Sequence, residues 1–145
     1  MTPEARVSDE DYRNLLELRT DLRRFLRWSE EQAVTSGLTP SQHQLLLAIR
    51  GHGDPRGPTI GDVAGYLLLR HHSVVGLVDR AESAKLVRRQ RDRDDHRTVR
   101  LSLTTRGARI LERLSERHLE ELARLAPRLE PLVAGLDKVE VGLRR

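Results

Sequence analysis

Cysteine is absent from this sequence of 145 residues, and aromatic residues make up only 3% of it. Without cysteine, disulfides, thiolate metal sites and thiol-based redox sensing are excluded. The core must therefore come from leucine, valine and alanine in a chain that is 33% charged, which favours packed helices over a sheet sandwich. No run approaches 18 apolar residues, so a membrane-spanning helix is not expected.

Signatures of catalysis and of secretion are also missing. The sequence contains no nucleophile elbow, phosphate-binding glycine loop, HExxH motif or paired-carboxylate arrangement that would indicate an enzyme. The first residues, MTPEARVSDED, lack the apolar core of a signal peptide. We therefore expect a cytoplasmic protein that is not an enzyme and uses no cofactor.

Positive charge is concentrated in residues 87–107, VRRQRDRDDHRTVRLSLTTRG. The stretch 88–106 holds seven arginines and three aspartates, a surplus of four, while the formal charge of the whole chain is +4. The rest of the chain therefore sums to zero. Apolar and polar residues alternate near Val87 and along 99–103, which predicts a hairpin of two half-buried strands. Guanidinium groups gathered on a hairpin beside a helix favour contact with a nucleic-acid backbone.

Helical periodicity surrounds this hairpin, and capping residues mark several helix starts. Thr39-Pro40 with Gln42, and Thr59 with Asp62, have the spacing of N-terminal caps. The predicted helices span residues 8–36, 40–51, 59–67, 70–85, 105–126 and 129–143, with a break at Ala126-Pro127. The third and fourth are joined by a few residues and followed by the hairpin, which predicts a helix-turn-helix with a wing.

The expected fold class is mainly α with a small β-hairpin wing, a winged helix-turn-helix plus a helical dimerisation domain. A DNA-binding region, residues 38–107, lies between an N-terminal dimerisation helix (1–37) and C-terminal dimerisation helices (108–145), all in one continuous domain. The flanking helices have apolar faces without an evident partner in the chain. A second copy is the simplest partner; a three-helix bundle within a monomer is the alternative.

The centre of the chain resembles the MarR family of bacterial transcription regulators, and the likeness extends over about residues 10–143. The segments LTPSQHQLLLAI, TIGDVAGYLLL, SVVGLVDRAESAKLVRR and DDHRTVRLSLTTRG follow one another in this order. The last is similar to the family's wing signature at Asp95, Arg97, Leu103, Thr104 and Gly107. The resemblance implies a homodimer that represses transcription at a pseudo-palindromic operator in double-stranded DNA and is relieved by a small aromatic or phenolic ligand.

Two positions depart from the family pattern. Lys85 stands where a glycine usually ends the recognition helix, and a left-handed residue other than glycine costs about 1–2 kcal/mol, so a different helix end is expected. Gly76 stands where a polar or basic side chain often reaches DNA, and it can read no base. This leaves open an alternative function, a winged-helix module for protein–protein contacts without specific DNA binding.

Candidate DNA contacts lie at the start of the fourth helix and at the turn of the hairpin. Arg97 is the first of them, because a guanidinium is attracted by the potential of a narrow minor groove. Asp95 is expected to brace it through a charge-assisted bond, and a surface ion pair is the alternative. The full set is Arg70, His71, His72, Ser73, Arg91, Arg93, Asp95 and Arg97.

The resemblance also implies an effector site between the dimerisation and DNA-binding regions. The candidates, chosen by placement, are Arg19, Trp28, His43 and Tyr66. Trp28 is also interpreted as a core or interface anchor, since large aromatic side chains commonly fill that role.

No metal site is expected. His71 and His72 are adjacent, so on a helix they point about 100° apart and do not readily share one ion. The aspartates at 92, 94 and 95 are expected to shape a turn rather than to bind Mg²⁺.

Overall fold

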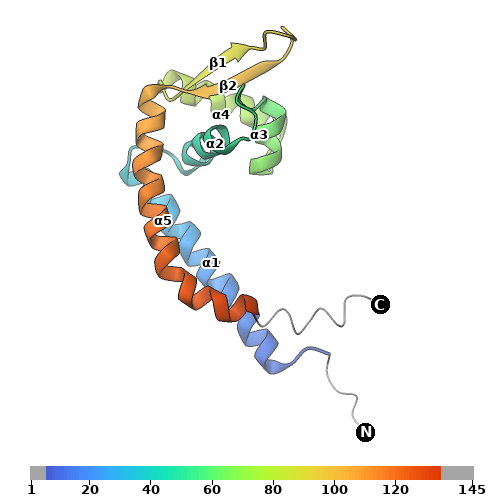
Figure 1. Cartoon of the computed structure of the whole chain (residues 1–145), viewed down its shortest axis with the longest axis vertical. Helices are drawn as coiled ribbons and strands as arrows, with labels where there is room; N and C mark the ends of the chain where they lie inside the picture. Colours follow the sequence, from blue (N-terminus) through green and yellow to red (C-terminus); the bar gives the residue numbers. More distant parts are fainter. Residues whose placement is uncertain (1–5, 135–145) are drawn as a thin grey trace. The chain divides into compact units, whose positions relative to one another are not determined.

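The computed structural model describes residues 6–134, which fall into two compact units (Figure 1). Of the described residues, the helical unit contains 6–29 and 117–134, and the winged unit contains 30–116. Along the chain the elements are α1 (Asp9–Thr35), α2 (Pro40–Gly51), α3 (Ile60–Leu67), α4 (His71–Ser83), β1 (Val87–Arg91), β2 (Val99–Leu103) and α5 (Thr105–Ala134). The predicted mainly helical fold with one small hairpin is confirmed.

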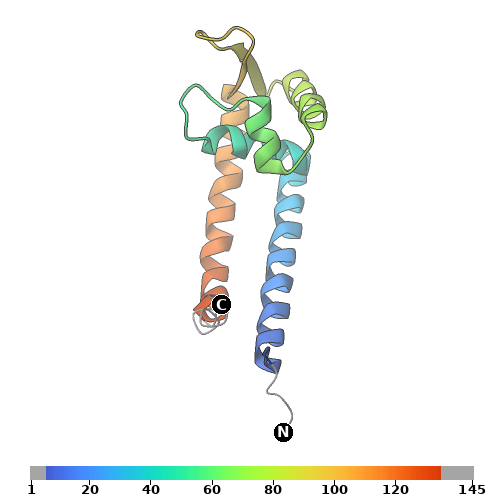
Figure 2. The same cartoon turned by 90° about the vertical axis from the view of Figure 1, so that its right-hand side faces the viewer.

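The hairpin is antiparallel, with Val87 opposite Leu103 and Arg91 opposite Val99. It is attached to the loop before α3 by a backbone hydrogen bond of 2.9 Å, donated by the Leu101 N–H to the Pro58 carbonyl. Figure 2 shows the loop end of the hairpin projecting beyond the helices of the winged unit. The hairpin is therefore attached to the winged unit through its strands, and its loop end, the wing tip, is open to solvent.

One apolar core supports the hairpin and the helices of the winged unit. Burial of each large aliphatic side chain contributes about 1.5–3 kcal/mol before the entropy of ordering is subtracted. The fully buried large apolar side chains are Leu45, Leu46, Val63, Val74, Val78, Leu86, Val87, Leu101 and Leu114. They come from α2, α3, α4, the hairpin and the start of α5, so the wing and the helix-turn-helix share one core.

Both predicted capping boxes are confirmed. The Thr39 hydroxyl accepts the Gln42 N–H at 3.1 Å, and the Gln42 side chain accepts the Thr39 N–H at 3.0 Å. Thr59 and Asp62 form the same pair of bonds at the start of α3. A cap of this kind contributes about 0.5–2 kcal/mol, which offsets part of the helix-destabilising effect of the glycines in α3.

The expectation that α4 ends differently from a glycine-terminated helix is wrong. Lys85 adopts a left-handed backbone with φ of 60°. Its N–H donates to the Glu82 carbonyl, and the Leu86 N–H donates to the Ala81 carbonyl, both at 2.9 Å. These two bonds form the Schellman motif that glycine usually permits. Because the buried Leu86 must follow at this position, the fold accepts the strained lysine.

Replacing Lys85 with glycine is expected to raise the free energy of unfolding by about 0.5–1 kcal/mol, because relief of the left-handed strain exceeds the added chain entropy. Chemical denaturation of the full chain measures this change. Ala84→Gly is the matched control: φ at Ala84 is −78°, so glycine relieves nothing there and should destabilise the protein. Equal destabilisation by both substitutions would contradict the assignment of strain to Lys85.

The predicted break at Ala126-Pro127 is also wrong, since α5 continues to Ala134 with Pro127 and Pro131 inside it. Each interior proline removes a helical hydrogen bond at a cost of about 3 kcal/mol. Tertiary contacts beyond Pro127 oppose this cost: Arg128 pairs with the buried Asp21 at 3.2 Å, and Leu132 is buried. Of the predicted last helix, residues 129–134 belong to α5, and its remaining residues lie outside the described part.

In the helical unit, α1 and α5 run side by side (Figures 1 and 2). The rings of Phe25, Trp28 and His118 cluster between them, with Trp28 and His118 centroids 4.9 Å apart. The Ser29 hydroxyl lies 2.6 Å from His118 Nε2. None of the helices in residues 6–134 combines the length and the apolar character needed to cross a membrane.

Many large apolar side chains of the helical unit are exposed. They lie on both helices and include Tyr12, Leu15, Leu16, Leu22, Leu26, Leu119, Leu122 and Val133. We refer to this set as the apolar face. Large apolar side chains exposed in such number on two neighbouring helices are typical of an interaction surface in a soluble protein.

Candidate nucleic-acid interface

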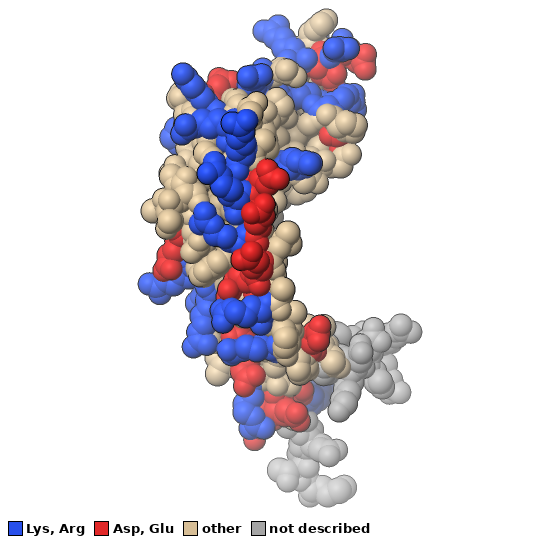
Figure 3. All heavy atoms as spheres, turned by 60° about the vertical axis from the view of Figure 1, so that its left-hand side comes forward, with Lys and Arg blue, Asp and Glu red and all other residues tan. Residues whose placement is uncertain are grey.

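The wing tip carries three exposed arginines, Arg91, Arg93 and Arg97. Within residues 6–134 none of their guanidinium groups forms an ion pair. On the face drawn in Figure 3, lysine and arginine side chains lie at the hairpin end of the winged unit with a few acidic side chains beside them, and further basic side chains lie along the rest of the molecule. The tip therefore presents positive charge that the described part of the chain does not neutralise.

Two other arginines of the hairpin have structural partners. Arg89 on β1 bonds Asp79 at 2.6 Å and Glu82 at 3.1 Å, which ties the strand to α4. Arg100 on β2 bonds Asp92 at 3.2 Å and also donates to the Gly57 carbonyl at 3.2 Å. Their charge holds the hairpin in place and is less available to a ligand.

The predicted bond between Asp95 and the Arg97 guanidinium is not formed, so this expectation is wrong. The Asp95 carboxylate instead accepts the Arg97 backbone N–H at 3.0 Å and the Thr98 hydroxyl at 3.1 Å. The Thr98 N–H donates back to the Asp95 carbonyl at 3.0 Å. Asp95 therefore shapes the turn that carries Arg97 and leaves its guanidinium unpaired.

The first turn of α4 differs from those of α2 and α3 because it has no side-chain cap. Arg70 occupies the N-cap position and makes no capping hydrogen bond. His71 and His72 are exposed, and Ser73 is half-buried. Free N–H groups at the positive end of a helix dipole, next to an arginine and two histidines, suit a phosphate oxygen.

Asp92 links the hairpin to the loop after α2. Its carboxylate is buried, pairs with Arg100 at 3.2 Å and with Arg56 at 3.6 Å, and accepts the Asp94 N–H at 3.3 Å. The Asp94 N–H is the main cause that lowers the pKa of Asp92, followed by Arg100 and then Arg56. Arg56 also pairs with Asp54 at 2.8 Å, which lowers the pKa of Asp54.

Asp92→Asn is expected to loosen the hairpin at neutral pH. The pKa of Asp92 is lowered in the folded state. The ionised carboxylate therefore stabilises the fold fully when the pH is above the ordinary carboxyl pKa, about 3.9. This stabilisation is lost as the pH falls through the lowered pKa of the folded state. Wild-type hairpin amides such as Leu101 should lose hydrogen-exchange protection as the pH falls below about 4. The variant should show reduced protection at pH 7.

Asp94→Asn is the control for this experiment, because the hydrogen bond that Asp94 donates to Asp92 comes from its backbone N–H, which the substitution keeps. It should leave hairpin protection at pH 7 unchanged. If the hairpin amides of the Asp92→Asn variant are as protected from hydrogen exchange at pH 7 as those of the wild type, Asp92 does not anchor the hairpin.

The four candidate effector residues are divided between the two units. Arg19 is exposed on α1, and Trp28 belongs to the ring cluster with Phe25 and His118, both in the helical unit. His43 is buried on α2, and the exposed Tyr66 has its hydroxyl 2.8 Å from His52 Nδ1, both in the winged unit. The ring contacts favour the interpretation of Trp28 as a core anchor.

Sequence reasoning missed the Asp92 network, whose only signal was acidic residues interleaved with arginines in 91–95. Its partners come from segments up to 43 positions apart, as in the Arg100–Gly57 bond. Among residues 6–134, no group of three or more histidine, aspartate or glutamate side chains is placed to hold a metal ion.

Several known proteins are similar to this chain in sequence or in fold. The model of the MarR family matches residues 36–98. The HTH-type transcriptional regulator PecS of Dickeya dadantii is 26% identical over 83 residues, 57% of this chain and 50% of that protein. The uncharacterized HTH-type transcriptional regulator YsmB of Bacillus subtilis is 33% identical over 85 residues, 59% of this chain and 56% of that protein. The chain thus spans about half the length of these curated relatives.

Among solved structures, a mutant of S. aureus MepR bound to an oligodeoxyribonucleotide has a TM-score of 0.63 with this chain. The identity is 23%, and the match covers 88% of this chain and 95% of that one. At 23% sequence identity, this similarity is evidence for a shared fold and for nothing more specific.

Proposed function

Because the model of the MarR family matches residues 36–98, we propose that the chain is a member of this family, a DNA-binding transcriptional regulator and not an enzyme. The observation that carries this proposal is the set of three unpaired guanidinium groups on the wing tip, Arg91, Arg93 and Arg97. Arginine forks match phosphate geometry, and cationic side chains also gain from release of the counterions condensed on DNA. The uncapped start of α4 lies in the same unit and adds a second set of donors.

In the proposed complex, the first turn of α4 enters the major groove and the wing tip follows the minor groove. Arg70, His71, His72 and Ser73 contact base edges and phosphates there, since half or more of such bonds go to phosphate and sugar. On the wing, Arg97 enters the minor groove, and Asp95 holds the turn that presents it.

The protein acts in this proposal as a homodimer through the apolar face of the helical unit. Two-fold symmetry then places two winged units on one operator, with half-sites about 10 base pairs apart. Repression relieved by a small aromatic or phenolic ligand is the regulatory mode that we propose for it, with Arg19, Trp28, His43 and Tyr66 as the candidate ligand contacts.

Selection of bound sequences from a random DNA library, using the full chain, tests the proposal. The expected product is a two-fold symmetric sequence whose affinity falls steeply with salt, with a slope of about −0.9 per neutralised phosphate. A lack of enrichment, or an affinity independent of salt, would instead support the winged-helix protein-interaction module.

A further inference from the structure

Gly76 lies in the middle of α4, at a position where the fold itself does not require a glycine. Among residues 6–134 the glycines with a positive φ are Gly37 and Gly57, so Gly76 has a backbone that any residue can adopt. A Cβ built on Gly76 would meet no backbone atom from elsewhere in the described chain within 4 Å. Since glycine is less favourable than alanine in a helix interior, another feature must account for it.

The space beside Gly76 is occupied by the side chain of Arg80. Arg80 Nη1 lies 3.4 Å from the position that a Cβ of Gly76 would take. Side chains of a helix point toward its N-terminus, so an arginine can fold back over the residue four positions earlier. The guanidinium therefore lies about one helical turn, roughly 6 Å, nearer the start of α4 than the Arg80 backbone does.

The Arg80 side chain is exposed and forms no ion pair within residues 6–134. The acidic residues of its own helix, Asp79 and Glu82, are engaged by Arg89 of β1. The positive charge of Arg80 is therefore not neutralised by its neighbours on α4.

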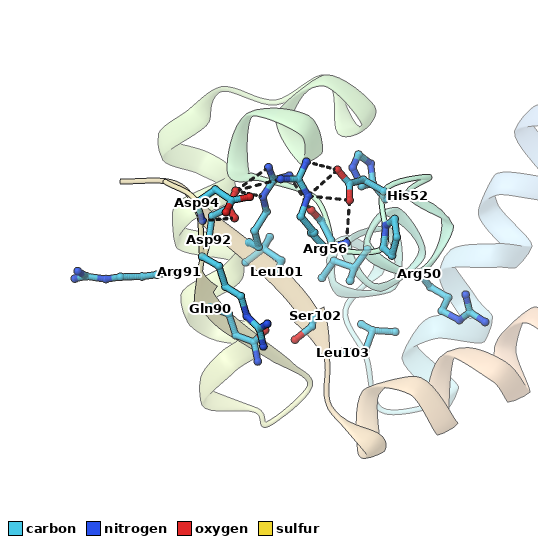
Figure 4. A pocket seen from close by; sticks show the side chains of 16 residues that line it. Arg50, His52, Arg56, Gln90, Arg91, Asp92, Asp94, Leu101, Ser102 and Leu103 are labelled. Carbon is cyan, nitrogen blue, oxygen red and sulfur yellow. Dashed lines mark hydrogen bonds and ion pairs between the residues drawn. The ribbon is translucent and has the colours of Figure 1, made fainter. Parts of the chain in front are cut away.

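Arginines that hold the winged unit together have a different environment. Figure 4 shows one of them, Arg56, in the groove between the loop after α2 and the hairpin, joined by dashed lines to acidic side chains. It pairs with Asp54 at 2.8 Å and with Asp92 at 3.6 Å. Because Arg80 has no contact of this kind in the described part of the chain, its guanidinium is available to a ligand.

Gly76 and Arg80 belong to the face of α4 that is turned away from the core. Residues four positions apart share a helix face, so His72, Gly76 and Arg80 form one row. His72 and Arg80 are exposed, and Gly76 is half-buried. The buried residues of α4 lie on the other side and are Val74, Leu77, Val78 and Ala81. The row begins in the first turn of α4, the part of the helix that the proposed function places in the major groove.

We propose that Arg80 reads a guanine base from the space that Gly76 leaves open, a role that rests on the proposed function because α4 must lie in the major groove. An arginine fork donates two hydrogen bonds to guanine O6 and N7, the commonest specific contact in this groove. Without a side chain at Gly76, the backbone of α4 can approach the base edges closely. Arg80 is then a specificity-determining residue.

Arg80→Lys separates base reading from simple charge, because lysine keeps the charge and loses the planar fork. We expect the operator selected by the wild-type chain to contain a guanine, at one symmetric position, that the Arg80→Lys variant no longer prefers. Replacing this G·C pair by A·T in both half-sites should weaken wild-type binding on the order of 25-fold or more, and binding of Arg80→Lys by less than about twofold. Fluorescence anisotropy measures both changes. Arg109→Lys, at an exposed position of α5, is the matched control and should keep the preference.

Gly76→Leu tests whether the open space is needed. It changes no charge and favours the helix, but the leucine would occupy the position of the Arg80 guanidinium. We expect it to lower operator affinity as much as Arg80→Gln does, on the order of 25-fold or more. The variant with both substitutions should lose no more than either alone, because both remove the same contact.

Gly76→Ala is the matched control for the leucine, since a single Cβ at 3.4 Å from Arg80 Nη1 still fits. It should bind the operator within about twofold of the wild type. Circular dichroism should show the same helical content in all of these variants.

Several results would overturn the inference. A guanine preference that Arg80→Lys keeps would indicate a phosphate contact, and losses that multiply in the double variant would mean that the two positions act on DNA separately. If the wild-type chain selects no sequence, the proposed function fails and the role of Arg80 fails with it. If Arg80→Gln binds the selected operator as tightly as the wild type, the proposed function stands and only the role of Arg80 is rejected.

Discussion

Changing Arg91, Arg93 and Arg97 together to glutamine is expected to lower DNA affinity about 1,000-fold or more at 150 mM salt, because a dimer loses six cationic contacts. The slope of log affinity against log salt should become shallower by about 5, at 0.9 per contact. The fold should remain, because all three side chains are exposed and form no ion pair in the described part of the chain. Anisotropy titrations at several salt concentrations measure both quantities.

The matched control removes the same charge elsewhere. Arg23, Arg27 and Arg109 are exposed on α1 and α5, and changing them to glutamine gives the same change in net charge. Exposed charges more than about 8–10 Å from a phosphate are largely screened at this salt concentration. The control should therefore lose only a few-fold in affinity. An equal loss in both triple variants would mean that net charge, and not the wing tip, drives binding.

Local sequence signals were sufficient for most of the winged unit. Thr39 and Thr59 predict the starts of α2 and α3 because a cap depends on residues only three positions apart. The alternation of apolar and polar residues predicts the hairpin, because this pattern also depends only on residues close together in the sequence. By contrast, α5 continues through Pro127 to residues that contact distant parts of the chain, such as Arg128, whose partner Asp21 is 107 positions away. A local proline rule contains no information about such a contact.

The candidate site shows the same division between local and distant information. The sequence shows that arginine is concentrated on the wing, but not which arginines are already paired. Arg89 and Arg100 are paired because α4 and the loop after α2 place carboxylates and a carbonyl beside the strands. The Asp95 turn depends on backbone geometry, which a two-residue spacing does not specify.

The dimer proposal predicts the other large effect. Leu16 on α1 and Leu119 on α5 are each 68% exposed and belong to the apolar face. Changing both to glutamate would place four carboxylates in a symmetric interface, and burial of unpaired charge is strongly unfavourable. We expect dissociation to monomers at micromolar concentration, a weakening of about 1,000-fold or more, measured by sedimentation velocity. Helical circular dichroism should stay close to that of the wild type.

Leu47→Glu with Leu68→Glu is the matched control, because both leucines are exposed in the winged unit, at 53% and 90%. This variant carries the same change in charge and should remain dimeric. The monomeric variant should also bind the selected operator far more weakly, since one protomer contacts only one half-site. A wild-type protein that sediments as a monomer would reject the homodimer, and a Leu16→Glu, Leu119→Glu variant that stays dimeric would place the interface elsewhere on the chain.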